Sequence, residues 1–560
     1  MDIRRTVLWM IFSLSLLLLW NNWQTYTGQP PLFGAAPTQS TQGEQAAASP
    51  TANDTSVPAA ATGTATTAAD NVPAGNATTA APSQKIDITT DVYKLTFDTQ
   101  GAQLVRAELR RYTAPEADDQ PMVLLDNSPS STYIAQTGVV GAPAGETFPT
   151  HLTPFKWVST DTALSGDTLD VVFESESGGV KVRKVYTLHK GRYDIAVRHE
   201  VVNQSNAPVA PSVYLQLVRD GNDPPDTSSF YSTFTGPAIY SSEEKFQKIT
   251  FSEIEKGNAS YVRQADNGWI AMVQHYFASA WVPPQGTVRH NEVLRVANNL
   301  YAVRAIESLG TVAPGETAQF SANLWVGPQD QQAMSELAPG LDLVVDYGFL
   351  TIISKPLFTL MTWLHSMLGN WGWTIVVLTL LIKLVFYPLS AASYRSMAKM
   401  KQVTPRMQAL REKFGDDKAK MNTAMMELYR TEKINPLGGC LPMLVQIPVF
   451  IALYWVLLGS VEMRGAPWIL WIHDLSARDP WFILPAIMMA TMFLQIKLNP
   501  TPPDPMQARI MMLMPLVFGG MMFFFPAGLV LYWCVNNTVS IIQQRYIMHK
   551  LDKEAAAAAR

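Results

Sequence analysis

Cysteine is almost absent from the 560-residue sequence: the two present, Cys440 and Cys534, fall in or beside apolar stretches of the C-terminal part. The region before them has no thiol to oxidise, which is compatible with an exported domain that folds without disulfides. A phosphate-binding loop, a His-Glu-x-x-His zinc motif, a Gly-x-Ser-x-Gly nucleophile elbow and a dinucleotide fingerprint are also missing. These absences argue against an enzyme. We expect no cofactor, no metal and no direct binding of nucleic acid.

Charge is sparse as well: Asp, Glu, Lys and Arg make up 16% of the residues, and the formal net charge is -4. This average combines two regions of different composition. Residues up to about 340 are mixed in composition, whereas from about 357 onward apolar blocks rich in Leu, Met, Phe and Trp dominate. We therefore expect a soluble region followed by membrane spans, where the position of each basic residue matters more than the total charge.

Residues 1–24 have the pattern of a signal anchor. Arg4 and Arg5 precede an apolar run, Val7–Trp20, and Trp23 follows it. A core of about 14 apolar residues also suits a cleaved signal peptide, which is the alternative. Because no small-x-small cleavage site follows the core directly and paired tryptophans favour a membrane interface, we predict an uncleaved transmembrane helix with both arginines in the cytoplasm.

Residues 25–84 consist mainly of Ala, Thr, Pro, Ser and Gln, with hardly a large apolar side chain. Such a composition buries too little apolar surface to offset the conformational entropy lost on folding. We predict a disordered periplasmic linker; a protein-binding segment is the alternative.

Residues 85–330 alternate between apolar and polar side chains, as half-buried strands do. The clearest alternating sets are Tyr93, Leu95 and Phe97; Leu169, Val171 and Phe173; Tyr193, Ile195 and Val197; and Val213, Leu215 and Leu217. Turns such as Ser177–Gly179 and Lys190–Arg192 separate the runs. Many short antiparallel strands predict a β-sandwich, similar to a supersandwich. Its histidines are scattered without metal-ligand spacing.

Residues 331–357 are expected to hold a connector and an amphipathic helix, Leu341–Lys355, on the outer membrane surface, although this helix could instead begin the next span. Five transmembrane helices follow, one within residues 358–390 and four within residues 440–547, before a tail at residues 548–560. The expected spans are Phe358–Leu389, Leu441–Gly459, Trp481–Ile496, Ile510–Phe525 and Leu529–Ile547. The first is too long for one straight crossing, so its start is expected to lie along the surface. With the anchor, six crossings place both termini on one side.

The loop between the second and third crossings, residues 391–439, carries ten basic residues against five acidic ones. The positive-inside rule therefore places this loop and both termini in the cytoplasm and the β-domain outside. Apolar residues in the loop recur every three or four positions, which predicts a helical hairpin with a kink at Pro405. The residues of this stripe are Met397, Met400, Val403, Met407, Leu410, Phe414, Met421, Met425 and Leu428.

One lysine, Lys383, lies inside the apolar run Trp373–Arg395. A bare ammonium in hydrocarbon is costly, so we expect it to face protein or trapped water and to mark a functional site. Thr379 and Tyr387 lie one helical turn to either side. Other spans add further polar groups, Gln446, Asn536 and Asn537. Together they predict a wet cavity within a helical bundle; the alternatives are that the lysine snorkels to the headgroups and that the amides join helices.

Several strings give the sequence a close resemblance to a known family. They are KLVFYPL (Lys383–Leu389), NPLGGCLPMLVQIPVF (Asn435–Phe450), WIHDLSARDP (Trp471–Pro480), DPMQ (Asp504–Gln507) and FPAGLVLYW (Phe525–Trp533). On these strings the chain resembles the YidC insertases of the bacterial inner membrane over nearly its whole length. The resemblance implies a multi-pass inner-membrane protein with a periplasmic domain and a five-span α-helical insertase core. It also implies a chaperone for nascent membrane proteins, working alone or with the Sec translocon, with contacts to lipids and ribosomes.

In such proteins a positively charged groove is open to the cytoplasm and to lipid but closed outward. The resemblance assigns its basic residue to Lys383, its polar lining to Thr379 and Gln446, and its substrate-contact wall to Tyr532 and Trp533. The familiar groove residue is arginine, so lysine is a departure: a guanidinium stays charged, whereas a buried ammonium can lose its proton. Two other functions compete, an ion-coupled transporter and an assembly factor without insertase activity. The predicted spans show no obvious repeat halves and no acidic residue near their centres, which argues against the transporter.

Overall fold

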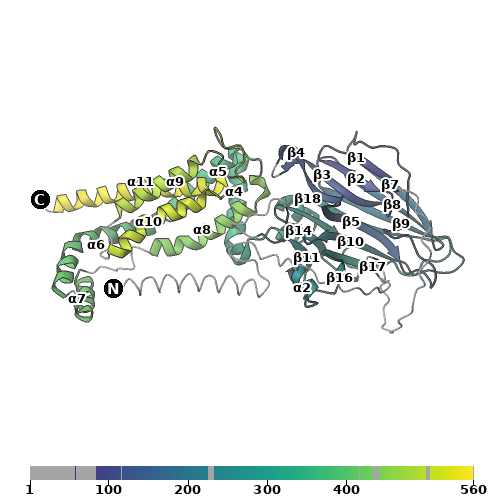
Figure 1. Ribbon diagram of the computed structural model, residues 1–560, viewed down its shortest axis with the longest axis horizontal. Coiled ribbons are helices and arrows are strands. Elements are labelled where there is room, and N and C mark those ends of the chain that lie inside the picture. Colours follow the sequence, from purple (N-terminus) through teal and green to yellow (C-terminus); the bar gives the residue numbers. More distant parts are fainter. Residues whose placement is uncertain are drawn as a thin grey trace. The chain divides into compact units, whose positions relative to one another are not determined.

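The computed structural model describes residues 57–58, 83–114, 117–224, 233–414, 417–432, 441–499 and 505–558. The predicted anchor at residues 1–24 and all but four residues of the predicted linker lie outside these ranges. The chain divides between Val345 and Asp346 into two compact units. The first is built of strands and the second of helices (Figure 1).

The first unit contains two antiparallel nine-stranded sheets within the described residues. In spatial order the first sheet consists of β1 (Lys85–Thr89), β2 (Tyr93–Asp98), β3 (Gln103–Ala114), β4 (Ala117–Ser128), β5 (Ser131–Val140), β10 (Ser212–Asp220), β17 (Leu300–Ser308), β16 (Arg289–Ala297) and β13 (Gln264–Ala265). The second consists of β12 (Lys245–Lys248), β11 (Gly236–Ser241), β14 (Trp269–Gln274), β15 (Phe277–Val282), β18 (Thr317–Pro328), β9 (Asp194–Asn203), β8 (Val180–His189), β7 (Thr168–Ser177) and β6 (Lys156–Trp157). The expected antiparallel β-architecture is present.

The two sheets pack against each other through a core that includes polar groups. Lys184 of β8 is fully buried, and its Nζ donates hydrogen bonds to the backbone oxygens of Gly101, at 2.7 Å, and Thr137, at 2.6 Å. The ammonium also lies 4.5 Å from the ring centre of Phe155. Burial lowers the pKa of Lys184 to about 7, because desolvation disfavours the charged form. Burial, and then the charge of Lys184, lower the pKa of the neighbouring His199.

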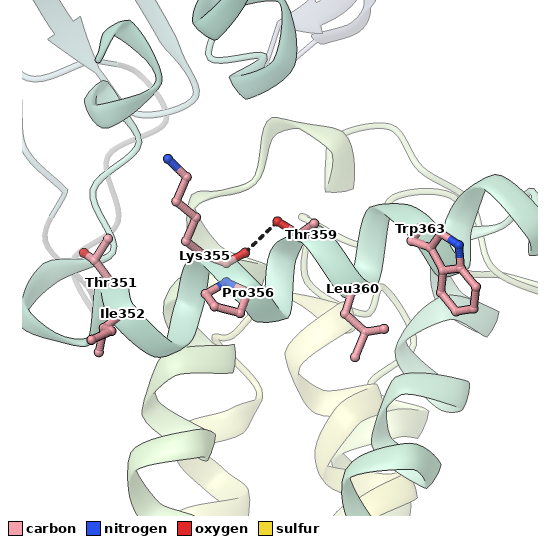
Figure 2. A pocket seen from close by; sticks show the side chains of 7 residues that line it. All are labelled: Thr351, Ile352, Lys355, Pro356, Thr359, Leu360 and Trp363. Atoms are coloured by element: carbon pink, nitrogen blue, oxygen red, sulfur yellow. Dashed lines mark hydrogen bonds between the residues drawn. The ribbon is translucent and has the colours of Figure 1, made fainter. Parts of the chain in front are cut away.

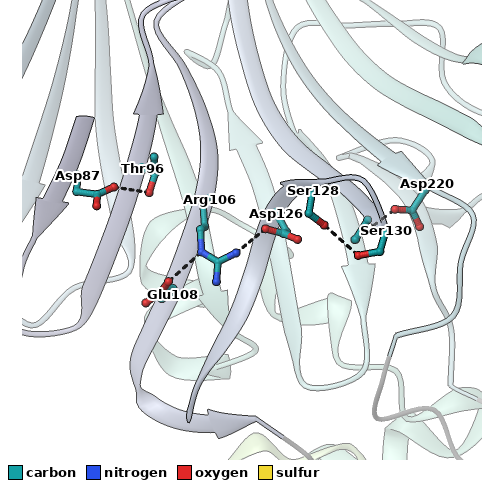
Figure 3. A network of polar contacts seen from close by, with 9 residues as sticks. Asp87, Thr96, Arg106, Glu108, Asp126, Ser128, Ser130 and Asp220 are labelled. Atoms are coloured by element: carbon teal, nitrogen blue, oxygen red, sulfur yellow. Dashed lines mark hydrogen bonds and ion pairs between the residues drawn. The ribbon is translucent and has the colours of Figure 1, made fainter. Parts of the chain in front are cut away.

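Polar contacts also run across one end of the first sheet (Figure 3). Thr96 of β2 donates to Asp87 of β1 at 2.7 Å. Arg106 of β3 contacts Glu108 at 2.8 Å and reaches Asp126 of β4 at 2.6 Å. These side chains are partly exposed, so the ion pairs contribute little stability, but they join neighbouring strands in register.

The second unit is helical. Its elements are η2 (Gly348–Leu350), α4 (Thr351–Leu368), α5 (Trp371–Val385), α6 (Tyr387–Phe414), α7 (Lys418–Thr431), α8 (Leu441–Gly459), η3 (Val461–Met463), α9 (Ile483–Leu498), α10 (Pro505–Met522) and α11 (Ala527–Ala558). The short helices α2 (Phe251–Glu255), α3 (Gln331–Leu337) and η1 (Leu341–Val344) belong to the first unit. The last four apolar segments predicted from the sequence correspond to α8, α9, α10 and α11.

The prediction of one helix over Leu341–Lys355 was wrong. Backbone at Val345 is extended and Gly348 has a φ of +60°, in the left-handed region, so a continuous helix cannot pass through this stretch. The regular helix begins instead at Thr351 and continues to Leu368.

The segment expected as one span, Phe358–Leu389, is divided twice. Gly369, with φ +64°, ends α4, and the Asn370 side chain caps the start of α5 by accepting from Trp373 N. A second break at Phe386 bends α5 against α6 by 64°. Pro388, the second residue of α6, lacks an N–H and clashes with the preceding turn, which prevents a straight continuation.

Within the described ranges, no single helix combines the length and hydropathy of a membrane span. The bent pair Trp371–Val385 and Tyr387–Met400 does so only when its two parts are taken together.

The predicted hairpin consists of α6 and α7. Val403 and Met407 are buried at its centre, and four side chains pack around them: Met400, Met425, Leu428 and Tyr429. Five of the nine residues of the predicted stripe therefore lie in this cluster. The helix continues through Pro405.

Candidate functional site

Lys383 lies in the last turn of α5 and points into the helical unit. Its side chain is 6% exposed, whereas the apolar neighbours Leu384 and Val385 are 69% and 73% exposed. This arrangement is the reverse of a soluble helix, where lysine faces out and leucine faces in. The ammonium therefore lies among the helices.

The nearest partner of the ammonium is a hydroxyl of α11. Lys383 Nζ donates to Ser540 Oγ at 2.8 Å, and Ser540 Oγ donates in turn to the backbone oxygen of Asn536 at 2.7 Å. The phenol of Tyr394, on α6, donates to the Ser540 backbone oxygen at 3.3 Å. Three helices thus contribute to one buried polar network.

Gln446 of α8 joins the same network. Its Oε1 lies 3.5 Å from Lys383 Nζ, and its Nε2 donates to Asn536 Oδ1 at 2.8 Å. In the described part of the chain, the polar partners of the Lys383 ammonium are hydroxyl and amide oxygens, and none of them is a carboxylate. Among the described residues, no acidic side chain therefore forms an ion pair with Lys383.

Three other predicted lining residues lie differently. Thr379 is buried, but its hydroxyl donates to Ile375 O within its own helix, at 2.7 Å. Asn537 faces α9, where its Nδ2 lies 3.5 Å from Thr491 Oγ1, so it joins two helices. Tyr387 is half-buried at the start of α6, beyond the bend, and is no longer one turn from the lysine on the same helix.

Sequence reasoning missed Ser540 and Tyr394. A signal for Ser540 was available, since it lies four residues after Asn536 and therefore on the same helical face. Tyr394 could not be found in this way, because only the bend between α5 and α6 brings it near α11.

The predicted wall residues form an aromatic cluster beside the polar network. Phe450 of α8 stacks on Tyr532, with ring centres 5.9 Å apart, and lies 4.5 Å from Trp533. Phe518 of α10 approaches Trp533 at 5.2 Å. Tyr532 is buried and Trp533 is half-buried. The Trp533 indole nitrogen is itself buried and finds no acceptor among the described residues.

The loop between α8 and α9 packs on the N-terminal end of α11. The buried carboxylate of Asp479 accepts from Leu484 N at 2.7 Å and from Trp471 Nε1 at 3.0 Å, which fixes the start of α9. Ala527 N donates to Ala477 O at 2.7 Å. This end of the bundle is held by backbone and buried side-chain hydrogen bonds.

A shallow hollow follows one face of α4 (Figure 2). Its lining residues are Thr351, Ile352, Lys355, Pro356, Thr359, Leu360 and Trp363. Ile352 and Trp363 are 83% and 57% exposed. Exposed apolar side chains beside a lysine are typical of a helix that lies at a membrane interface.

Two family profiles together match nearly all of the chain after residue 84. The profile described as YidC periplasmic domain matches residues 85–360, and that described as 60Kd inner membrane protein matches residues 363–554. The chain is 68% identical to the membrane protein insertase YidC of Bordetella petrii over the full length of both. It is 51% identical to that of Burkholderia multivorans over 98% of this chain and 99% of the relative. A crystal structure of an active YidC insertase with its first transmembrane domain resolved is similar at 19% identity and a TM-score of 0.39, covering 83% of this chain and 93% of that one.

Proposed function

The chain belongs to the YidC family of membrane protein insertases, and we propose that it inserts its substrates through a groove centred on Lys383. As a member of this family it is an inner-membrane protein with a periplasmic domain, and its substrates are membrane proteins. The groove, its lining and its substrate-contact wall are our assignment.

The buried ammonium of Lys383 carries the proposal. It lies among neutral oxygens, and no ion pair with another described residue cancels its field, so the ammonium can act on an incoming charge. Two opposite charges attract more strongly in a low-dielectric interior than in water. An acidic or polar external tail of a substrate is therefore drawn toward Lys383, and the network of Ser540 and Gln446 holds the ammonium in place.

The apolar helix of the substrate leaves sideways past Tyr532 and Trp533 into lipid. Burial of that helix in hydrocarbon supplies the driving force, and no nucleotide is needed. The short helix α9 assists: its 16 residues span about 24 Å, against about 30 Å of hydrocarbon. The bilayer thins around such a helix, which lowers the barrier for a polar tail.

Substrates first meet the hairpin of α6 and α7, whose methionines adapt to many apolar partners.

We further propose six crossings with both termini in the cytoplasm. The two-part segment of α4 and α5 forms the entry to the second crossing. The exposed apolar face of α4 lies at the outer interface. Partners of the chain are the Sec translocon, membrane lipids and the ribosome.

Charge reversal tests the groove. Purified chain in proteoliposomes would insert a single-span substrate with an acidic tail, scored by protection of the tail from external protease. We expect Lys383→Arg to retain insertion and Lys383→Glu to abolish it. Lys355→Glu, which reverses an exposed charge on α4, is the matched control and should leave insertion near the wild-type level.

A substrate with a neutral tail distinguishes the electrostatic effect of Lys383→Glu from damage to the fold. Its insertion should respond much less to Lys383→Glu, whereas a damaged fold would impair insertion of both substrates. Equal insertion of the acidic substrate by wild type and Lys383→Glu would refute the electrostatic groove. Transport of an ion coupled to Lys383, without insertion, would favour the transporter instead.

A further inference from the structure

The first sheet carries apolar side chains on its outer face, which is the face turned away from the second sheet. Thr137 of β5 points toward the second sheet, since its hydroxyl lies 2.8 Å from His199 Nε2 on β9. Side chains alternate along a strand, so Gly138 and Val140 lie on the opposite, outer face. Tyr214 of β10 pairs with Gly138 and shares that face.

Ile306 of β17 pairs with Tyr214 and completes an apolar patch, which consists of Val140, Tyr214 and Ile306. These three side chains are 7%, 0% and 2% exposed. An outer sheet face in contact with water normally carries polar side chains. An apolar patch at this place therefore needs a cover.

Val57 provides part of this cover. It comes from outside both sheets and packs against the apolar patch, and the next residue, Pro58, is buried. Both belong to residues 25–84, the segment that composition predicts to be a disordered linker. We propose that the dipeptide Val57–Pro58 is a docking element that attaches this linker to the outer face of the first sheet of its own chain.

The chemistry of the dipeptide suits docking without a paired strand. Proline has no N–H, so its burial leaves no donor unsatisfied. The residue before a proline is restricted to extended conformations, so less entropy is lost when the segment is fixed. Val57 then provides the apolar side chain, which residues 25–84 otherwise rarely contain.

A polar band next to the patch limits what can dock. Gln216 Nε2 donates to Gln136 Oε1 at 2.8 Å, and Arg304 Nε donates to Glu292 Oε2 at 2.6 Å. These side chains bond to one another, and an apolar strand laid over them would offer their remaining polar atoms no hydrogen-bond partner. The patch therefore accepts a short apolar element rather than a long one.

The chain contains its own matched control, since a second Val-Pro pair, Val72–Pro73, lies in the same compositional segment. A benzophenone amino acid would replace residue 57 or residue 72 in the full chain in nanodiscs, followed by illumination and mass spectrometry. We expect position 57 to crosslink to peptides containing Tyr214 or Ile306, and position 72 to give at least several-fold less of that product.

Mixing isotopically light and heavy chains identifies the occupant. Crosslinks within one chain support docking of its own linker, whereas crosslinks between light and heavy chains would overturn it in favour of a second copy. Equal yields from positions 57 and 72, or no product with the patch, would also overturn the proposal.

Substitution gives an independent measure. Val57→Asp places a charge on the patch, and we expect proteinase K to cleave the chain near residue 57 about tenfold faster, because the open form becomes more populated. Val72→Asp should leave that rate unchanged. Cleavage of Val57→Asp at the wild-type rate would contradict docking.

Discussion

The Lys383 ammonium on α5 donates a 2.8 Å hydrogen bond to the hydroxyl of Ser540 on α11, a residue 157 positions away in the sequence. Neither side chain would be expected in an apolar helix alone. The neutral acceptor fixes the position of the ammonium, and in the proposed mechanism the charge of Lys383 then acts on a substrate.

Removal of the hydroxyl that accepts from Lys383 should reduce insertion of an acidic-tailed substrate without removing the charge of Lys383. Ser540→Ala deletes the hydroxyl, and we expect insertion of an acidic-tailed substrate to fall by about tenfold, the value of a hydrogen bond to a charged group. Ser540→Thr retains the hydroxyl and should restore insertion. A neutral-tailed substrate should respond little to either change. Wild-type insertion of the acidic substrate by Ser540→Ala would show that Ser540 does not position Lys383.

The buried indole N–H of Trp533 has no acceptor among the described residues, which costs free energy unless a substrate supplies one. Trp533→Phe keeps an aromatic ring and removes the donor. We expect insertion to slow by about fivefold at unchanged protein abundance, since one hydrogen bond to the substrate is lost. Trp468, in the loop between α8 and α9, also has a buried indole nitrogen with no acceptor among the described residues, so Trp468→Phe is the control. Equal effects of both substitutions would assign the loss to packing.

The buried Lys184 of the β-unit should make stability depend on pH. Its pKa is about 7 in the folded chain and 10.5 in an ordinary setting, so between these values the unfolded chain binds more protons. The free energy of unfolding therefore rises with pH across this window, by up to about 1.4 kcal/mol per pH unit, and the cost of burying the charge is fully present below pH 7. Urea-dependent hydrogen exchange of β8 peptides in the full chain, repeated at several pH values, measures this free energy of unfolding.

Lys184→Met should remove this pH-dependent contribution. Lys181→Met, on the same strand but partly exposed, should retain it. The same slope in both variants would mean that another group controls the pH dependence.

Deletion of most of residues 85–328 should leave insertion of a simple substrate intact, because the described members of the polar network around Lys383 belong to the helical unit. Proteoliposomes with equal amounts of full-length and truncated chain provide the comparison. Complete loss of insertion by a truncated chain that is folded and abundant would contradict this prediction and assign the β-unit a direct role.

The alternation of Leu169, Val171 and Phe173 and of similar sets was sufficient to predict an antiparallel β-architecture, since one apolar face must be buried. The apolar blocks likewise predicted α8 to α11. The sequence-based prediction treated Phe358–Leu389 as one apolar segment and missed the break at Phe386. Pro388, two residues after Phe386, was a signal for this break that the prediction did not use.

The sequence by itself determined that Lys383 is an isolated charge in apolar surroundings, and hence that it needs a special environment. Only the tertiary structure decided which groups provide that environment. Helices α5, α8 and α11 bring together Lys383, Gln446 and Ser540, whereas Asn537 faces away and Tyr387 lies beyond the bend. The reason is physical: helical periodicity fixes the neighbours within one helix, but contacts between helices depend on rotations and bends that come from packing.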